Sequence, residues 1–187
     1  MDVAADYFKL GYVHVIPSGF DHILFILGIF LLNSCIRSVI IQCSVFTLAH
    51  SITLGLAASS FILPDPKIVE PLIAASILFV AIENIFRNKV YPSRLAVIFF
   101  FGLIHGMGFA NAIKGIGLSA NHFVGSLLFF NLGVEFGQIN VIMAAYFLIA
   151  KWLSQKQWYQ SRVVYPLSSL IACIALYWTI ERLFFAV

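Results

Sequence analysis

The stretch FTLAHSITLGLA, residues 46–57, places His50 inside a long run of apolar residues. That run extends over about 38–62, and a spanning α-helix needs about 20 mostly apolar residues. An ionisable side chain at bilayer depth costs several kcal/mol, so it usually faces the protein interior and marks a pathway or a site. The stretch therefore predicts a membrane helix whose interior face carries function.

The composition of the whole chain agrees with a membrane location. Of 187 residues, 61% are hydrophobic and 10% are charged, and the mean hydropathy is +0.99. Soluble domains carry about 25% charged residues, so this composition does not fit a water-soluble core. The net charge of +3 is too small, and its carriers are too scattered, to indicate nucleic-acid binding. The sequence contains no P-loop or other nucleotide-binding motif.

Six apolar segments are long enough to cross a bilayer. They predict an all-α polytopic membrane protein, a bundle of six transmembrane helices with short loops, and a single domain over residues 1–187. The predicted helices cover about 20–36, 38–62, 67–87, 93–114, 122–150 and 163–185.

Lysine and arginine residues in the loops predict the orientation of this bundle, because cytoplasmic loops carry an excess of them. With both termini outside, the inner side holds Arg37, Arg87, Lys89, Arg94, Lys151, Lys156 and Arg162, and the outer side holds Lys9, Lys67, Lys114 and Arg182. This bias predicts a multi-pass protein of the cell membrane (the inner membrane in a Gram-negative cell) with both termini outside.

The stretch HVIPSGFDH, residues 14–22, is the first candidate site. Its Pro-Ser-Gly break could let His14 fold back over the start of the following helix. Asp21 and His22 diverge by about 100° on a helix, so they need not bind the same ion. Asp21 could instead complement the helix dipole, and His14 could be an interfacial histidine. Together the three residues predict an outer metal site.

Two histidines, His50 and His105, fall near the middle of predicted helices. His50 shares a helix face with Ser51, a secondary polar candidate, and a mid-helix imidazole needs a metal, a carboxylate or another polar partner. His105 lies in FFGLIHGMGFA, where Gly102 and Gly106 form a GxxxG pair that permits close helix packing. Such packing would bring His105 toward a neighbouring helix. A structural histidine with a satisfied ring is the alternative for His50.

The stretch FFNLGVEFGQ, residues 129–138, places Glu135 on one helix face with Asn131 and Gln138. An uncompensated carboxylate at that depth would protonate. Glu135 is therefore expected to be a metal ligand, a proton carrier or both, with the two amides as secondary ligands or supporting donors. A purely structural polar network is the alternative.

Two further carboxylates belong to the segment 67–86. Glu70 lies near its outer end and could simply be an exposed helix start. Glu83 lies near its inner end, where it could release an ion inward or pair with Arg87 at i+4. Both are secondary candidates.

Imidazole nitrogens and carboxylates together suit a divalent transition metal such as nickel, cobalt, zinc, copper or iron. The predicted metal ligands are His14, Asp21, His22, His50, His105 and Glu135. A metal permease, passive or ion-coupled, is the first hypothesis. An intramembrane metalloenzyme that activates water on zinc or a di-metal pair is the second, and a metal-binding accessory subunit of a membrane complex is the third. The glycine-rich fourth helix could also serve contacts in a homo-oligomer.

Five stretches in consistent order resemble the HupE/UreJ family of small membrane proteins: GFDHILFIL, FTLAHSITLGLA, VEPLIAASI with IEN, FGLIHGMGFA and FNLGVEFGQ. The better-known members of that family are taken to be nickel or cobalt permeases. The resemblance implies that His14, Asp21 and His22 form the family's functional motif on the first helix.

The chain departs from the nickel-permease pattern in two places. The spacer between His14 and Asp21 has six residues, VIPSGF, where five are expected. Phe101 and Gly108 also stand where a second motif, close to FHGxAHGxE, has its first histidine and its final glutamate, whereas His105 is kept. The chain thus resembles a second branch of the family, and Glu135 could replace the missing carboxylate.

Overall fold

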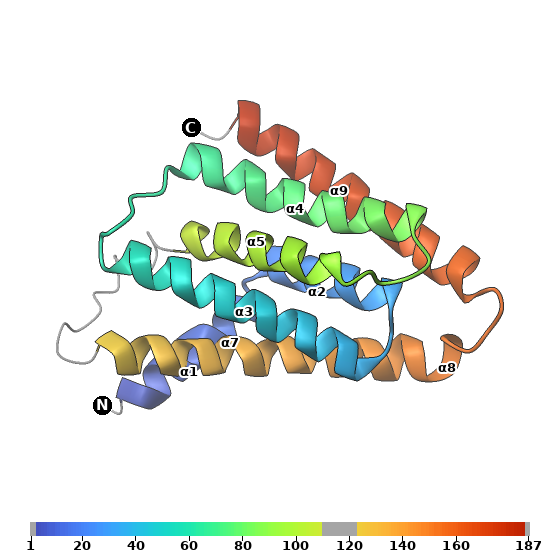
Figure 1. Cartoon of the computed structure of the whole chain (residues 1–187), viewed down its shortest axis with the longest axis horizontal. Helices are drawn as coiled ribbons and strands as arrows, with labels where there is room; N and C mark the ends of the chain where they lie inside the picture. Colours follow the sequence, from blue (N-terminus) through green and yellow to red (C-terminus); the bar gives the residue numbers. More distant parts are fainter. Residues whose placement is uncertain (1–2, 110–122, 186–187) are drawn as a thin grey trace.

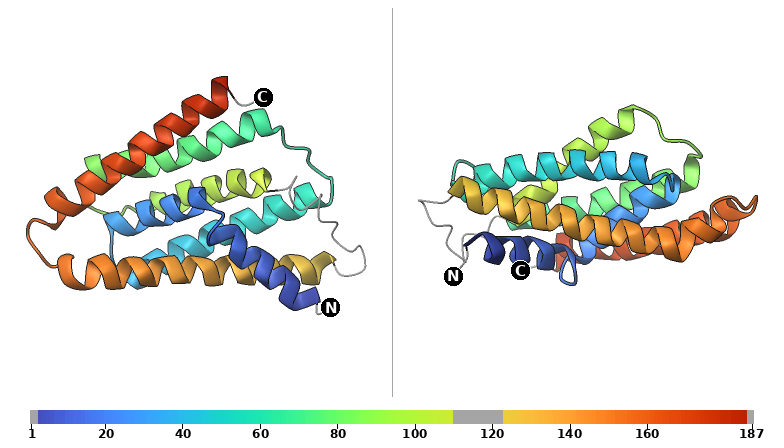
Figure 2. Two further views of the ribbon diagram at one scale, coloured as in Figure 1. Left: turned by 180° about the vertical axis from the view of Figure 1, so that it is seen from behind. Right: turned by 90° about the horizontal axis from the view of Figure 1, so that it is seen from below.

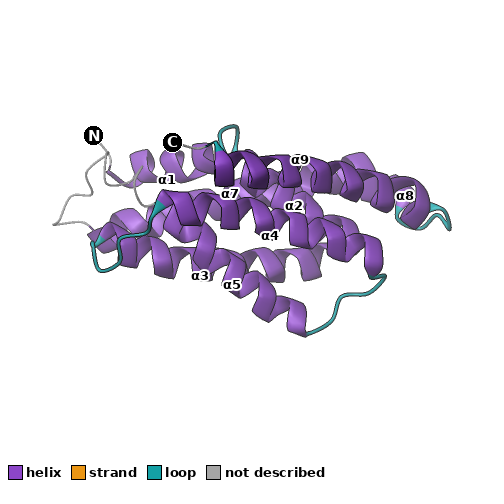
Figure 3. Cartoon of the chain, turned by 90° about the horizontal axis from the view of Figure 1, so that it is seen from above, coloured by secondary structure: helices purple, strands orange, loops and turns teal. Residues whose placement is uncertain are grey.

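A computed structural model describes residues 3–109 and 123–185, and within these ranges the regular structure is entirely helical (Figures 1 and 3). This confirms the predicted all-α class. Two short π-helical turns, η2 and η3, adjoin the last long helices. The elements are α1 (Val3–Val15), α2 (Phe20–Leu32), α3 (Ile36–Ala58), α4 (Pro66–Phe86), α5 (Ser93–Gly108), α7 (Phe123–Ala145), η2 (Tyr146–Ala150), α8 (Lys151–Leu153), η3 (Gln160–Val164) and α9 (Tyr165–Phe184).

The helices form an elongated bundle, and loops at its two ends connect successive helices (Figures 1 and 2). Three pairs of helices make the most extensive contacts: α1 with α7, α3 with α5, and α4 with α9. The described parts of α1 and α9 that lie nearest the two termini are at the same end of the bundle (Figure 1). We call this the terminal end. Which side of a membrane it faces remains a prediction from the loop charges.

The outer surface of the bundle is strongly apolar, as a lipid-facing surface requires. Large side chains on several helices are more than half exposed, among them Leu48, Phe100, Leu148, Leu170 and Phe184. A soluble protein of this size would bury most of them.

Four helical segments are long and apolar enough to cross a membrane among the described residues: Ile36–Ala58, Pro66–Phe86, Phe123–Leu153 and Gln160–Phe184. A fifth crossing results if α1 and α2, which are bent by 66° relative to each other, form one broken span. α5 has only 16 residues, and the continuation predicted to 114 lies outside the described residues. The predicted count of six is therefore not confirmed.

The first predicted helix, 20–36, differs most from the structure. α2 ends at Leu32 and has 13 residues, a length of about 20 Å, whereas a bilayer core is about 30 Å thick. The preceding segment forms a separate helix, α1, which packs against α7. Glycines permit this packing: a Cβ atom at Gly11 would collide with the Phe130 carbonyl, and one at Gly133 with the Phe8 carbonyl.

Glycines also bring α5 against α3. A Cβ atom at Gly102 would lie 2.5 Å from the Phe46 carbonyl oxygen, and one at Gly106 would collide with the His50 carbonyl. Thr53 of α3 donates a hydrogen bond of 2.7 Å to the Leu103 carbonyl of α5. The expectation that the GxxxG pair brings His105 toward a neighbouring helix is confirmed.

Candidate metal centre

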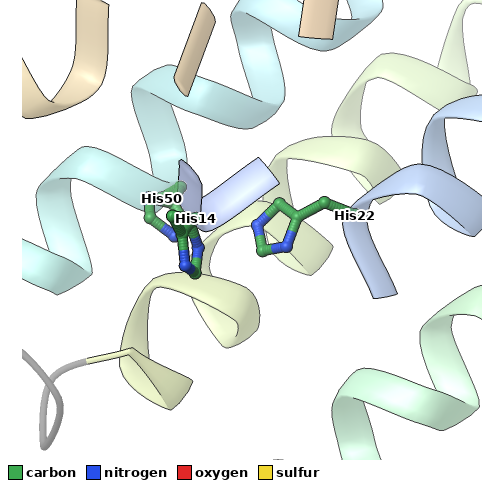
Figure 4. A group of neighbouring side chains, drawn as sticks. All are labelled: His14, His22 and His50. Carbon is green, nitrogen blue, oxygen red and sulfur yellow. The ribbon is translucent and has the colours of Figure 1, made fainter. Parts of the chain in front are cut away.

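Three histidines from three different helices converge near the terminal end of the bundle. His14 lies in the last turn of α1, His22 in the first turn of α2, and His50 near the middle of α3 (Figure 4). One ring nitrogen from each lies within 4.8 Å of the others. His22 and His50 are buried, and His14 is half-buried. We call these three residues the histidine cluster.

The break between α1 and α2 creates half of this cluster. Pro17 and Gly19 interrupt the helix, and the 66° bend turns His14 back toward the first turn of α2. The His14 and His22 ring centroids are 4.6 Å apart. The expectation that His14 folds back beside His22 is therefore confirmed.

The cluster leaves several imidazole nitrogens without hydrogen-bond partners. His14 Nε2, His22 Nε2 and both ring nitrogens of His50 are buried and unpartnered. Leaving one buried polar group unsatisfied costs about 1–3 kcal/mol, and buried polar groups are nearly always paired. Converging, unpartnered imidazoles therefore point to a ligand that accepts nitrogen lone pairs, as a transition-metal ion does.

A fourth histidine, His105 of α5, adjoins the cluster. Its ring centroid lies 5.4 Å from that of His22. The Ser76 hydroxyl lies 2.7 Å from the Ile73 carbonyl, to which it donates, and 2.9 Å from His105 Nε2. A hydroxyl has one proton, so His105 Nε2 must be the donor to Ser76. His105 Nδ1 then carries a free lone pair, and this atom is buried without a partner.

Aromatic side chains enclose the imidazoles. The His14 ring lies 3.9 Å from the ring of Phe109 and 5.6 Å from that of Phe130, and the His105 ring lies 5.0 Å from that of Phe46. An apolar shell of this kind excludes water and strengthens electrostatic interactions. No sequence pattern distinguishes these phenylalanines, since Phe occurs 19 times in the chain.

A cavity of about 270 Å³ adjoins the histidines. Its walls include His14, His22 and His105, the exposed turn at Ser18, and the carboxylates of Asp21 and Glu70.

Asp21 does not join the histidine cluster. Its two carboxylate oxygens each accept a 3.1 Å hydrogen bond from Arg182 Nη2 of α9.

Glu135 lies in a separate contact between α3 and α7. It accepts a hydrogen bond of 2.9 Å from Ser44, and one turn further along α7 the Thr47 hydroxyl donates to Gln138 Oε1 at 3.0 Å. Asn131 donates to the carbonyl of Leu127 in its own helix. Glu135 and Gln138 thus belong to the α3–α7 contact, and the residues that line the histidine cavity include none of these three.

The remaining secondary candidates have local partners. Ser51 donates to the Thr47 carbonyl of its own helix at 2.6 Å. Glu83 lies at the opposite end of the bundle from the histidines, where it pairs with Arg87 at 2.8 Å and with the fully buried Arg94 at 3.1 Å. Of the two alternatives for Glu83, the structure shows the ion pair, and it adds Arg94, which the sequence analysis counted only as a loop charge.

The fold and the site define a polytopic helical membrane protein with a buried imidazole cluster. The family model described as HupE / UreJ protein matches residues 1–182, so the chain belongs to the HupE / UreJ family. Comparison with curated proteins and with solved structures gave no match.

Proposed function

We propose that this protein binds a divalent transition-metal ion and moves it across the membrane. His14, His22 and His50 are the proposed ligands, and His105 is the proposed fourth. One observation carries the proposal: buried ring nitrogens from three helices lie within 4.8 Å of one another, and four nitrogens of these rings have no hydrogen-bond partner. The family is generally related to nickel and cobalt transport, which makes these two ions the first candidates, ahead of zinc, copper and iron.

Neutral imidazoles bring nitrogen lone pairs but no negative charge, and burying an uncompensated dication in an apolar shell is costly. Glu135, which carries a negative charge when ionised, accepts its hydrogen bond elsewhere, from Ser44. We therefore expect an ion at this centre to be bound less tightly than at a centre that adds a carboxylate ligand.

The proposed path runs from the terminal end through the histidine cluster and then along α3 and α7. Along α3, Thr47 and Ser44 follow His50 at intervals of about one turn, and their hydroxyls donate to Gln138 and Glu135 of α7, respectively. Glu135 is the proposed next ligand or proton carrier on this path. With the termini outside, as the loop charges predict, this direction is inward, and transport is passive or ion-coupled.

A metalloenzyme is the second candidate function. Three histidines with an adjoining cavity of about 270 Å³ also resemble a catalytic zinc site, in which three protein ligands leave a fourth position for water. The two functions differ in what happens to the metal: an enzyme retains its ion during turnover, whereas a permease must exchange it with both sides.

The test uses the full chain purified in detergent and then reconstituted in liposomes. Metal content is measured by mass spectrometry after equilibration with Ni²⁺, Co²⁺ or Zn²⁺, and uptake is followed with a metal-sensitive dye inside the vesicles. We expect bound metal and uptake in the native protein, and loss of both in His22→Gln and His50→Gln. Glu181→Gln, a change in an exposed side chain of α9, is the matched control. No binding of any of these ions by the native protein would overturn the proposal, and binding without uptake would favour the enzyme.

A further inference from the structure

The mouth of the histidine cavity carries two carboxylates from two helices. Asp21 belongs to the first turn of α2 and Glu70 to the first two turns of α4. Both line the cavity that His14, His22 and His105 also line. The His22 side chain is 6% exposed and its Nε2 has no partner, so an unpartnered buried ligand atom adjoins the two carboxylates.

One guanidinium already occupies the space between these carboxylates. Arg182 Nη2 lies 3.1 Å from both oxygens of Asp21, and Arg182 Nη1 lies 3.3 Å from Glu70 Oε2. Arg182 Nη1 also donates to the Glu70 carbonyl at 3.2 Å, and its guanidinium lies over the ring of Trp178 at 5.4 Å. Asp21 and Glu70 therefore already hold a cation, and that cation is part of the protein.

We infer that Asp21 and Glu70 form an entry site for the transported dication, and that Arg182 occupies this site until the ion displaces it. The inference rests on the proposed function, because it assigns the step that precedes binding at the histidine cluster. Two carboxylates and one guanidinium leave one net negative charge at the cavity mouth. That charge attracts cations from solution, and carboxylate oxygens are suitable ligands for the first contact.

Arginine suits this role because its guanidinium stays charged and has several N–H donors, so that Nη2 serves Asp21 while Nη1 serves Glu70. It cannot release Asp21 by losing a proton. Asp21 and Glu70 therefore become available only when another cation competes for them or when the end of α9 moves. Asp21 and Arg182 are partly exposed, with 24% and 20% of their side-chain surface accessible, so a competing ion reaches them from the surface.

Removing the guanidinium charge should strengthen cation capture. A dication about 6 Å from a unit positive charge in aqueous surroundings is repelled enough to weaken its binding about tenfold. We therefore expect Arg182→Gln to accelerate association of the ion about tenfold. Arg182→Lys keeps the charge and should stay close to the native protein. In Asp21→Asn/Glu70→Gln the entry site is absent, so association should slow at least tenfold and lose most of its dependence on ionic strength.

The experiment follows Co²⁺ binding to the purified full chain by stopped-flow absorbance, since the visible spectrum of Co²⁺ reports its ligands. Lys9→Gln is the matched control, because it removes an exposed positive charge from α1. Thermal unfolding verifies that each variant is folded, and the double carboxylate variant tests the inference even if Arg182→Gln does not fold. Final Co²⁺ stoichiometry and the spectrum should be unchanged, since the histidines remain.

The outcomes separate this inference from the proposed function. Native-like association rates in both Arg182→Gln and Asp21→Asn/Glu70→Gln, with normal final Co²⁺ binding, would overturn the entry site and leave the histidine centre intact. Loss of the final Co²⁺ spectrum in the double carboxylate variant would also overturn it, because the carboxylates would then be ligands of the final site. Absence of Co²⁺ binding in the native protein would overturn both.

Discussion

Adding one methyl group at Gly102 should separate the two helices that position His50 and His105. A Cβ atom there would lie 2.5 Å from the Phe46 carbonyl oxygen and 2.8 Å from Ala49 Cβ. Atoms of these kinds pack at about 3.5–4.0 Å, so α5 must move by about 1 Å relative to α3. The backbone carbonyl of a helix cannot yield as a flexible side chain would.

The free energy of unfolding should fall accordingly. Overpacking of this kind lowers the free energy of unfolding by about 1–3 kcal/mol. The higher helix propensity of alanine offsets at most about 1 kcal/mol of this loss. For a protein of this length each kcal/mol lost lowers the unfolding temperature by about 2–4 °C. The shift also moves the helix that carries His105, so metal affinity should fall together with thermal stability.

The assay compares Gly102→Ala with Gly125→Ala. Gly125, in α7, has no atom within 4 Å of an added Cβ, so its replacement should leave the unfolding temperature unchanged or raise it slightly. Thermal unfolding is followed by circular dichroism in detergent, and metal content is measured on the same samples. Equal unfolding temperatures and metal contents in the two variants would refute the close α3–α5 packing on which the site depends.

Three other predictions concern single side chains and protons. Ser76→Ala removes the acceptor that holds the ring of His105, so metal affinity should fall about 10–100-fold with little change in unfolding temperature; titration calorimetry would measure this loss, and native affinity would contradict the assigned role. Metal binding should weaken as pH falls, because a metal must displace protons from the imidazoles; calorimetry in buffers of different ionisation enthalpy would detect the released protons, and buffer-independent heats would argue against imidazole ligands. Burial raises the pKa of the Tyr159 phenol above its usual value of 10.0, and the hydrogen bond with Ser34 lowers it in part. Stability from the neutral phenol is therefore complete below pH 10 and is lost as pH rises through the raised pKa, and Tyr159→Phe should weaken this alkaline loss in a pH series of thermal unfolding.

Most of the correct predictions came from residue patterns within single helices. The apolar runs predicted the helical class, and the unusual placement of His50 and His105 in such runs predicted a site inside the bundle. The GxxxG pair at Gly102 predicted the close approach of two helices, because a missing side chain has a direct steric consequence. Family resemblance added the role of the segment that contains His14 and His22.

Contacts between distant segments could not be predicted in this way. Arg182 pairs with Asp21 across 161 positions, and no local pattern distinguishes it from an ordinary charge at a helix end. Glu135 was grouped with the histidines because it lies near the middle of a predicted helix. The depth of a residue in the membrane does not determine which neighbouring helix its side chain faces. Glu135 contacts Ser44 of α3 instead of the histidines. The role of α1 was also missed, since its 13 residues are too few to span a bilayer alone.

X-ray absorption spectroscopy of the Ni²⁺- or Co²⁺-loaded protein tests the central claim most directly. It reports the number, type and distance of the atoms bound to the metal. The account predicts imidazole scattering from at least three histidines, with metal–nitrogen distances near 2.0–2.2 Å, and one imidazole fewer or no bound metal in His50→Gln. A spectrum with oxygen ligands only, or one that His50→Gln leaves unchanged, would contradict the account.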